Sequence, residues 1–417
     1  MRDLYDWSGR NRWQILILAG VLIRTLMLLK KRPFWLDETS LYGNIVDRSI
    51  YDMLSQLKSE QVVPPGFLML LRCTYQIMGQ NEIALRALPF LSGIMALILF
   101  LSFCREHFSG SSGFVCAALF TLNSDLIYYC QEMKPYAMDV LVGVLAMRML
   151  MKSQVANESS TVGWEWWALA LSPWFSIAGL FNIVGLAIML GIKARRNLSR
   201  LRPLLIVSIV WVVSFGICYR MEGKQVSPNS GLWVFWHFAF LKWDQPRQNI
   251  ALLLDNLINP LHFLSSFSNT PIMMAWAGCV VLTLGIGWIR LRYHSRLLFE
   301  FISICLGGMG AASLLRLYPS HGRTLISITP FVICIFGEGV RRLREKTASK
   351  YRDIVWLLLI TPLLSFAWSS PLKGPRPVLY DGDLEPDHFM HAFGIMSERA
   401  SPISHPISHS IPSNRSN

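Results

Sequence analysis

Apolar residues occur in blocks of about 16 to 20, separated by short segments that are basic or contain Pro and Gly. A helix needs about 20 mainly apolar residues to cross a bilayer core of about 30 Å. Of the 417 residues, 53% are hydrophobic and 16% are charged, whereas about 25% are charged in ordinary soluble domains. The sequence therefore predicts a single all-α polytopic membrane domain over residues 1–369, surrounded by membrane lipids, in preference to two soluble domains.

This spacing predicts about 11 transmembrane helices, within a range of about 10 to 13. The candidate spans are residues 13–29, 85–104, 112–129, 136–151, 164–177, 178–192, 203–220, 274–290, 297–315, 324–340 and 353–369. Residues 164–192 could instead form one tilted helix or a hairpin broken near Pro173 and Gly179. A signal peptide is the alternative for residues 13–29, but Arg24 lies within the run and no small-residue cleavage site follows, which favours a retained span.

The formal net charge of +13 does not indicate a nucleic-acid partner. Lys and Arg lie mainly between apolar blocks and not along one amphipathic face, and the tendency of cytoplasmic loops to be basic explains them. With a cytoplasmic N-terminus, the three most basic short loops, 193–202, 290–296 and 341–352, all face inward. The segments that then face outward are residues 31–84, 130–135, 221–273 and 317–323.

Two helices are expected within the first outer loop. Residues 39–58 have apolar positions at helical spacing, which predicts a helix on the membrane surface. Residues 64–79 are apolar but short and contain Arg72, which predicts a re-entrant or juxtamembrane helix. After the last span, residues 370–417 are rich in Pro, Ser and His and have no apolar periodicity, so a disordered tail is expected.

The eight cysteines give no sign of a metal site or a disulfide framework. Most lie within apolar runs, and none has CxxC or similar spacing. We interpret them as small packing residues.

Charged residues that could take part in catalysis lie at the outer ends of three predicted spans. Asp37 and Glu38 follow the first span, Glu132 and Lys134 lie between the third and fourth spans, and Arg323 lies near the start of the tenth. Gln131 and His321 accompany these residues. A carboxylate can take a proton from an acceptor, and Lys and Arg can hold a phosphate leaving group. The set suits an enzyme acting on a lipid-linked substrate at the membrane boundary.

Each of these residues also has a structural interpretation. Polar side chains at helix ends are commonly caps or interfacial anchors, and His237 and His321 could be interfacial histidines. The aromatic stretch 230–243 could line an acceptor groove, although a helix at the interface would have the same composition.

Four stretches carry a resemblance to a known family. They are RTLMLLKKRPFWLDETSLYGNIV, QVVPPGFLMLLR, NEIALRALPFLSGIMALILFLSF and YYCQEMKPYAMDVL, within residues 24 to about 150. In order and spacing they resemble the first third of GT-C fold glycosyltransferases related to protein O-mannosyltransferases and the lipid A aminoarabinose transferase. A weaker similarity lies in GRTLISITPFVICIFGEG.

The resemblance implies a GT-C helical bundle and an inverting sugar transfer, of hexosyl or mannosyl type, from a polyprenyl-phosphate donor to a lipid, glycan or protein acceptor. By the same resemblance, Asp37 would be the catalytic base, with Glu38 as its partner and Glu132 organising the site. The residues that would bind substrate are Gln131, Lys134, Tyr136, Arg86, Arg323 and His321.

The chain departs from the family pattern at three positions. Lys134 replaces the usual Arg, which keeps the charge but loses bidentate geometry. Thr324 replaces the Tyr that usually follows the Arg at 323, and Val63 replaces a His before the paired prolines. Arg86 could meet the donor phosphate or extend to the interface. A divalent cation on Asp37, Glu38 and Glu132 is possible chemically, but no His or Cys ligand spacing points to one.

Two other functions compete with glycosyl transfer. A transporter or flippase predicts polar residues within the spans and internally repeated halves, and neither is evident. A non-catalytic assembly protein would not need the three acids to converge. The resemblance favours a bacterial inner membrane with an outward-facing site, because the chain lacks the luminal insertion of eukaryotic relatives and a retention signal.

Overall fold

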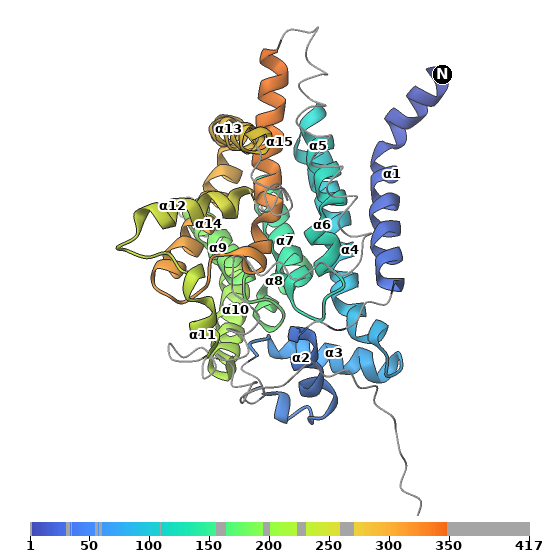
Figure 1. Cartoon of the computed structure of the whole chain (residues 1–417), viewed down its shortest axis with the longest axis vertical. Coiled ribbons are helices and arrows are strands. Elements are labelled where there is room, and N and C mark those ends of the chain that lie inside the picture. The colour runs from blue at the N-terminus through green and yellow to red at the C-terminus, as the bar shows by residue number, and fades with distance from the viewer. Residues whose placement is uncertain are drawn as a thin grey trace, which may run out of the picture. The chain divides into compact units, whose positions relative to one another are not determined.

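The computed structural model describes residues 2–30, 34, 36–54, 57, 61–108, 110–155, 164–194, 201–222, 231–258 and 271–347. Every regular element in these ranges is a helix (Figure 1). The α-helices are α1 (Arg2–Leu29), α2 (Leu36–Val46), α3 (Pro65–Ile77), α4 (Glu82–His107), α5 (Gly110–Leu122), α6 (Ser124–Tyr129), α7 (Tyr136–Val155), α8 (Trp164–Ala170), α9 (Gly179–Ala194), α10 (Leu201–Glu222), α11 (Gly231–Phe235), α12 (Pro246–Ile258), α13 (Pro271–His294), α14 (Arg296–Leu314) and α15 (Thr329–Lys346). The 3-10 helices are η1 (Asp52–Leu54), η3 (Ser172–Trp174), η5 (Trp236–Ala239) and η7 (Gly322–Ile328).

Several described helices can cross a membrane. Four have the required length and hydropathy: Asn11–Leu29, Glu82–His107, Arg296–Leu314 and the continuous η7–α15 segment Gly322–Lys346. Shorter apolar helices cover Ser112–Leu122, Gly179–Ile192 and Leu205–Met221. The predicted all-α polytopic membrane protein is therefore confirmed. The predicted span at 353–369 and the predicted tail at 370–417 lie outside the described residues.

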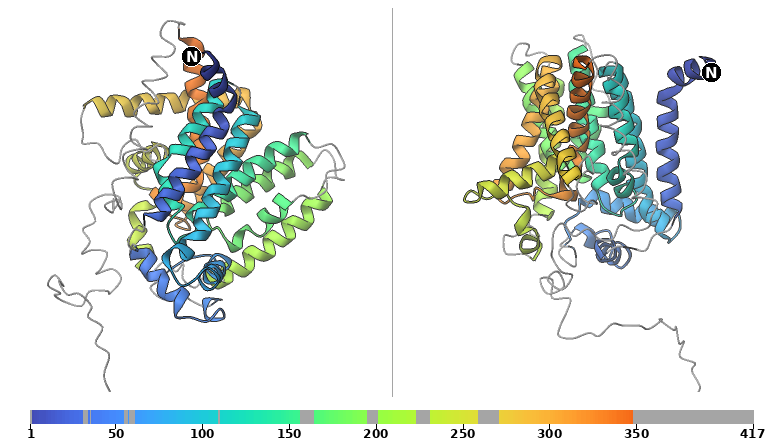
Figure 2. Two further views of the ribbon diagram at one scale, coloured as in Figure 1. Left: turned by 90° about the vertical axis from the view of Figure 1, so that its right-hand side faces the viewer. Right: turned by 45° about the horizontal axis from the view of Figure 1, so that its top comes forward.

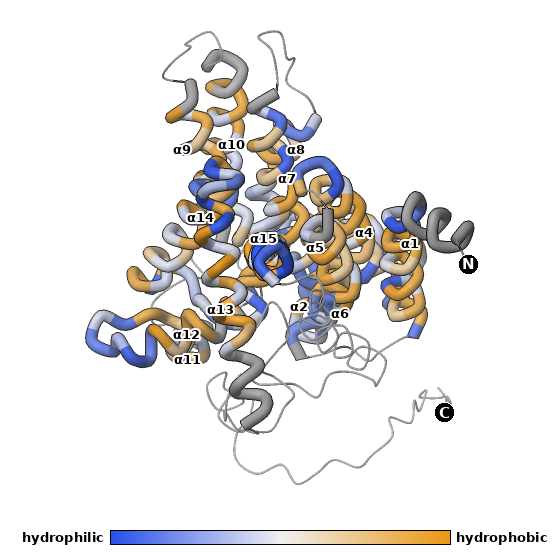
Figure 3. Tube along the Cα trace, turned by 90° about the horizontal axis from the view of Figure 1, so that it is seen from above, coloured by the Kyte–Doolittle hydropathy of each residue, from blue (hydrophilic) through white to orange (hydrophobic). Residues whose placement is uncertain are grey.

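The bundle is built around α7 and α15. Residues 329–340 of α15 are all buried, and this helix packs against α5 and α13. Helix α7 packs against α4 and α9, while α1 lies at one side of the bundle against α4 and α5 (Figures 1 and 2). Hydrophobic residues run along α1, α4 and α5, and hydrophilic residues gather at the near end of α15 (Figure 3).

Helices α13 and α15 cross with their backbones in contact. A Cβ atom at Gly287 would lie 1.8 Å from the carbonyl oxygen of Ile335, and one at Gly339 would lie 2.0 Å from that of Thr283. No side chain fits at either position. Small residues at such crossings let membrane helices approach closely and gain van der Waals contact.

The predicted span 112–129 is not one helix. It breaks at Asn123, whose side-chain oxygen accepts a hydrogen bond from the Leu126 backbone N–H at 3.0 Å and caps α6. The break leaves carbonyl groups at the end of α5 without helical partners. Arg24 of α1 is fully buried and donates to two of them, Thr121 at 3.0 Å and Phe120 at 3.4 Å. This contact makes α1 part of the folded bundle.

Two further predictions of helix extent were wrong. Residues 164–177 do not form one span but the short helix α8 followed by η3, because Pro173 cannot continue an α-helix. The structure agrees with the alternative prediction that the chain breaks near Pro173 and Gly179. The predicted surface helix at 39–58 begins earlier, at Leu36, and ends at Val46. Beyond it, Ser49 donates from its hydroxyl to the Asp52 carboxylate at 2.7 Å and forms a turn.

Helices α2 and α3 form a small core of their own. Leu41 and Ile45 of α2 pack with Phe67 and Leu71 of α3, and Met133 closes the cluster. Arg72, which interrupts the apolar run of α3, donates to the last carbonyls of α2, Ile45 at 2.7 Å and Val46 at 2.9 Å. Packing on Met133 brings the start of α2 beside residues 131–134.

Candidate active site

The first turn of α2 holds two carboxylates that face different partners. Asp37 lies 2.8 Å from Arg323 of η7, measured between Oδ2 and Nη2. Both side chains are partly exposed, at 15% and 21%. The acids after the first span and the arginine before α15 therefore meet at one site, and their charges remain accessible.

Glu38 is enclosed. It is fully buried and receives two hydrogen bonds from Arg86 of α4, from Nε to Oε1 and from Nη2 to Oε2, both at 3.3 Å. The Met133 backbone N–H also donates to Glu38 Oε1 at 3.0 Å. Arg86 is itself only 3% exposed, and its guanidinium carbon lies 5.1 Å from the Phe34 ring centroid. Arg86 thus ties α2 to α4 and does not extend to the interface.

The turn at residues 131–134 supplies the third part of the site. Lys134 donates to the side-chain oxygen of Gln61 and lies close enough to Asp37, Glu132 and Glu38 for their charges to act on it. Glu132 is buried in the same turn. Gln131 points back toward α6 and donates to the Ile127 carbonyl at 2.9 Å. Lys134 therefore joins this turn to the first outer loop by a polar contact, in addition to the packing of Met133 against α2 and α3.

Arg323 has an aromatic neighbour that the sequence did not single out. Its guanidinium carbon lies 5.5 Å from the ring centroid of Trp236 in η5. Two residues earlier in the same segment, His321 packs edge-on against Phe238 at 5.5 Å between ring centroids. A cation over an indole face is attracted by the ring quadrupole. Trp236 thus helps to hold Arg323 beside Asp37.

Hydrogen bonds to backbone groups hold this aromatic segment in place. The Ser320 N–H donates to the Ala239 carbonyl at 2.7 Å, and the Asn256 amide donates to the Ser320 carbonyl at 2.6 Å. Residues 236–239 and 256 are consequently joined to the segment that leads into η7. On the other side, Tyr318 donates to the Thr324 carbonyl at 2.7 Å.

The charges around Asp37 decide its protonation. Burial opposes ionisation of the carboxyl, but the charges of Arg323 and Lys134 and the hydrogen bond from Arg323 outweigh it, so the pKa of Asp37 lies below its ordinary value. For Lys134, burial outweighs the attraction of Asp37 and lowers its pKa. Asp37 is therefore ionised near neutral pH.

Tyr136 begins α7 at the edge of this cluster. Its ring centroid lies 5.0 Å from that of Tyr129. The charges of Arg323, Glu132 and Asp37 all act on its hydroxyl group. The structure thus brings Asp37, Lys134, Tyr136 and Arg323 together, whereas Glu38 and Arg86 form a buried pair behind them.

Sequence reasoning missed two members of the site. Trp236 lies in the aromatic stretch 230–243, whose composition fits an interfacial helix as well as a groove and does not indicate contact with Arg323. Gln61 precedes the paired prolines and has no chemical signature beyond its amide. Among the described residues, no group of three His, Cys, Asp or Glu side chains could hold a metal ion.

Solved structures with a similar fold exist. ArnT from Cupriavidus metallidurans in the apo state aligns with a TM-score of 0.51 and 15% identity, over 87% of this chain and 69% of that one. The same protein bound to undecaprenyl phosphate aligns with a TM-score of 0.53 and 14% identity, over the same shares. No protein-family model and no curated protein sequence matches the chain. The likeness confirms the GT-C fold that the resemblance of the four quoted stretches implies.

Proposed function

We propose that this protein is an inverting glycosyltransferase that moves a sugar from a polyprenyl-phosphate donor to an acceptor. The observation that carries the proposal is the meeting of Asp37 with Arg323 beside Lys134, which joins a candidate base to candidate phosphate ligands. The structural likeness to ArnT, one structure of which holds undecaprenyl phosphate, supports a donor of this class.

In the proposed reaction the acceptor hydroxyl or amine attacks the sugar C1. The new bond forms as the bond from C1 to the phosphate oxygen breaks on the opposite face, and the acceptor proton passes to Asp37. The leaving group is polyprenyl phosphate, whose developing negative charge Arg323 and Lys134 offset. No covalent enzyme intermediate forms, so a single displacement inverts C1, in contrast to retaining glycosidases.

Because Asp37 is paired with Arg323, binding of the donor phosphate to Arg323 would change the strength of Asp37 as a base. A phosphate that binds Arg323 takes over part of its charge, so the attraction that lowers the pKa of Asp37 becomes weaker. The carboxylate then binds a proton more readily. Asp37 would thus be a better base with donor in place than without it.

The basic helix ends support an outward-facing location for the reaction. Basic residues at 290–296 and 341–346 lie at helix ends, and Arg323 lies at the opposite end of the η7–α15 span. The positive-inside rule supports a cytoplasmic side for the basic ends. The site would then face outward from a bacterial inner membrane. The resemblance supports a hexose such as mannose as the sugar, and a lipid, glycan or protein as the acceptor.

Transfer of radiolabelled sugar from a polyprenyl-phosphate donor, with the purified protein and a membrane extract as acceptor source, tests the proposal. Asp37→Asn should reduce transfer at least about a hundredfold, the usual contribution of a general base. Asp52→Asn is the matched control, because Asp52 lies in the same loop and its carboxylate accepts a hydrogen bond from the neighbouring Ser49, which is not a residue of the candidate site. Equal activity of the two variants would remove Asp37 as the base, and a wild-type protein that transfers no sugar would overturn the function itself.

A further inference from the structure

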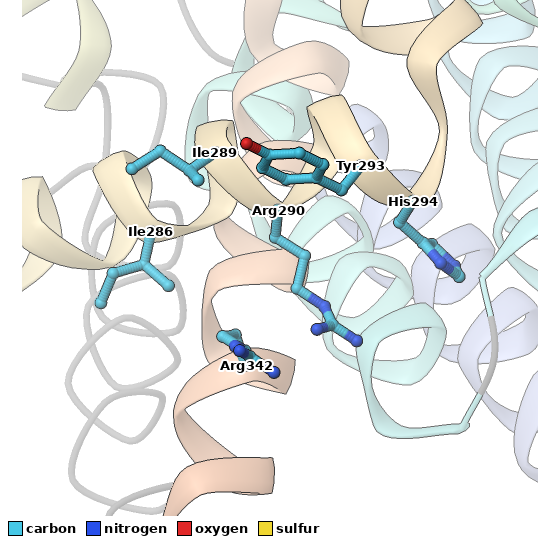
Figure 4. A pocket seen from close by; sticks show the side chains of 6 residues that line it. All are labelled: Ile286, Ile289, Arg290, Tyr293, His294 and Arg342. Atoms are coloured by element: carbon cyan, nitrogen blue, oxygen red, sulfur yellow. The ribbon is translucent and has the colours of Figure 1, made fainter.

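A charged pocket lies between the ends of α13 and α15, at the opposite end of the η7–α15 span from Arg323. Helix α15 alone separates residues 329 and 342 by about 20 Å, at about 1.5 Å per residue. The pocket has a volume of about 450 Å³. It is lined by Ile286, Ile289, Arg290, Tyr293, His294 and Arg342 (Figure 4).

Positive charge exceeds negative charge around this pocket. Arg290 lies 3.0 Å from Glu345 and 3.5 Å from the buried Glu338. Arg341 lies 3.0 Å from Glu345 and 3.4 Å from Glu338. Arg342 shares Glu345 with both, at 3.6 Å. Three guanidinium groups therefore share two carboxylates.

Arg342 is the least satisfied of the three arginines. Glu345 is its only ion-pair partner among the described residues, and the 3.6 Å contact is longer than a charge-assisted hydrogen bond. A guanidinium group has five N–H donors. Its side chain is 42% exposed, and Arg290 extends from α13 toward it (Figure 4). A phosphate between Arg290 and Arg342 would balance the excess positive charge.

An apolar stripe on α13 leads to these arginines. Leu282, Ile286, Ile289 and Tyr293 are spaced at three or four residues and so share one helix face. Leu282, Ile289 and Tyr293 are 67%, 61% and 80% exposed. In a membrane protein such a face contacts acyl chains. Tyr293, near the helix end, combines an apolar ring with a hydroxyl group, as is common at the headgroup level.

From this arrangement we infer that the pocket binds an anionic phospholipid, with its phosphate between Arg290 and Arg342 and an acyl chain against the exposed apolar residues of α13. Basic pockets between membrane helices bind lipid phosphates in this way. The site is separate from the proposed donor site, because it lies at the other end of the span. Glu338 and Glu345 keep Arg290 in position and disfavour a second anion.

Native mass spectrometry of the detergent-solubilised protein tests this inference. The protein is titrated with phosphatidylglycerol, phosphatidylcholine or inorganic phosphate, and Arg342→Gln is compared with wild type. Arg296→Gln is the matched control, since Arg296 is 83% exposed, pairs with Glu300 and lies outside the pocket. Phosphatidylglycerol should bind wild type and R296Q equally and R342Q about fivefold more weakly, as expected for the loss of one basic residue.

Three results would overturn the inference: equal affinity of R342Q and R296Q for phosphatidylglycerol, equal binding of phosphatidylcholine, or displacement of phosphatidylglycerol by inorganic phosphate at a similar concentration. Ile289→Asn provides a second variant at an exposed position, and it should weaken binding without loss of fold. Sugar transfer is not measured, so failure of the proposed function leaves this result unaffected.

Discussion

The Asp37 carboxylate and the Arg323 guanidinium group lie 2.8 Å apart, although one begins α2 and the other begins the segment that leads into α15. The contact joins the N-terminal outer loop to the C-terminal part of the bundle. Any substrate phosphate that binds Arg323 must therefore compete with a carboxylate already in place.

The first prediction concerns the pH dependence of transfer. In Arg323→Gln the charge and the hydrogen bond of Arg323 are absent and only Lys134 still opposes the effect of burial, so the pKa of Asp37 should rise. Asp37 must be ionised to accept a proton, and the acid limb of kcat/KM should therefore move to higher pH. Profiles between about pH 4 and 8 would measure it, since kcat/KM reports groups of the free enzyme. An acid limb shared by R323Q and wild type would contradict the pairing.

The second prediction concerns the buried pair of Glu38 and Arg86. Arg86→Met leaves a buried carboxylate without its cation and should cost about 3–5 kcal/mol of stability. Adding Glu38→Gln removes the buried charge and keeps an acceptor for the Met133 N–H, so the double variant should recover much of the loss. Thermal unfolding in detergent measures both. A double variant less stable than R86M would show that the pair is not the source of the cost.

The third prediction concerns Arg24. In Arg24→Met the carbonyls of Thr121 and Phe120 lose their donor, which should lower stability by about 1–3 kcal/mol. Arg12→Met serves as the control, because Arg12 is exposed on the same helix. The thermal midpoint of each variant provides the measure, and equal midpoints would argue against a role for Arg24 at the break.

The fourth prediction concerns the crossing of α13 and α15. Gly287→Ala forces the backbones apart, because its Cβ would lie 1.8 Å from the Ile335 carbonyl oxygen, and it should destabilise the protein by about 1–3 kcal/mol. Gly285 lies about half a turn away on α13, and a Cβ atom there would meet nothing within 4 Å. Gly285→Ala should be neutral or stabilising, since Ala favours helix. Similar unfolding temperatures for the two variants would exclude a close crossing.

The sequence was most informative about features that depend on residues close together in the chain. Apolar block length predicted the helices, and the acids and bases at outer span ends predicted which segments meet at Asp37 and Arg323. It was least informative where a helix breaks. Asn123 lies in an apolar run long enough to span, and the carbonyls that its break exposes are satisfied by Arg24, which comes from a different helix. Likewise, nothing local distinguishes Glu38, enclosed by Arg86, from its neighbour Asp37, because that difference arises from which side of α2 faces α4.

Adjacent residues on a helix are rotated by about 100° from each other, at 3.6 residues per turn. Because Glu38 is held by both Arg86 and the Met133 N–H, the rotation of α2 about its own axis is fixed, and that rotation directs Asp37 at Arg323. The number of residues between the start of α2 and Glu38 therefore determines whether Asp37 lies opposite Arg323. A one-residue insertion within its first turn would place a different side chain opposite Arg323, while changes of length in the loop beyond Val46 would leave the aim of Asp37 intact.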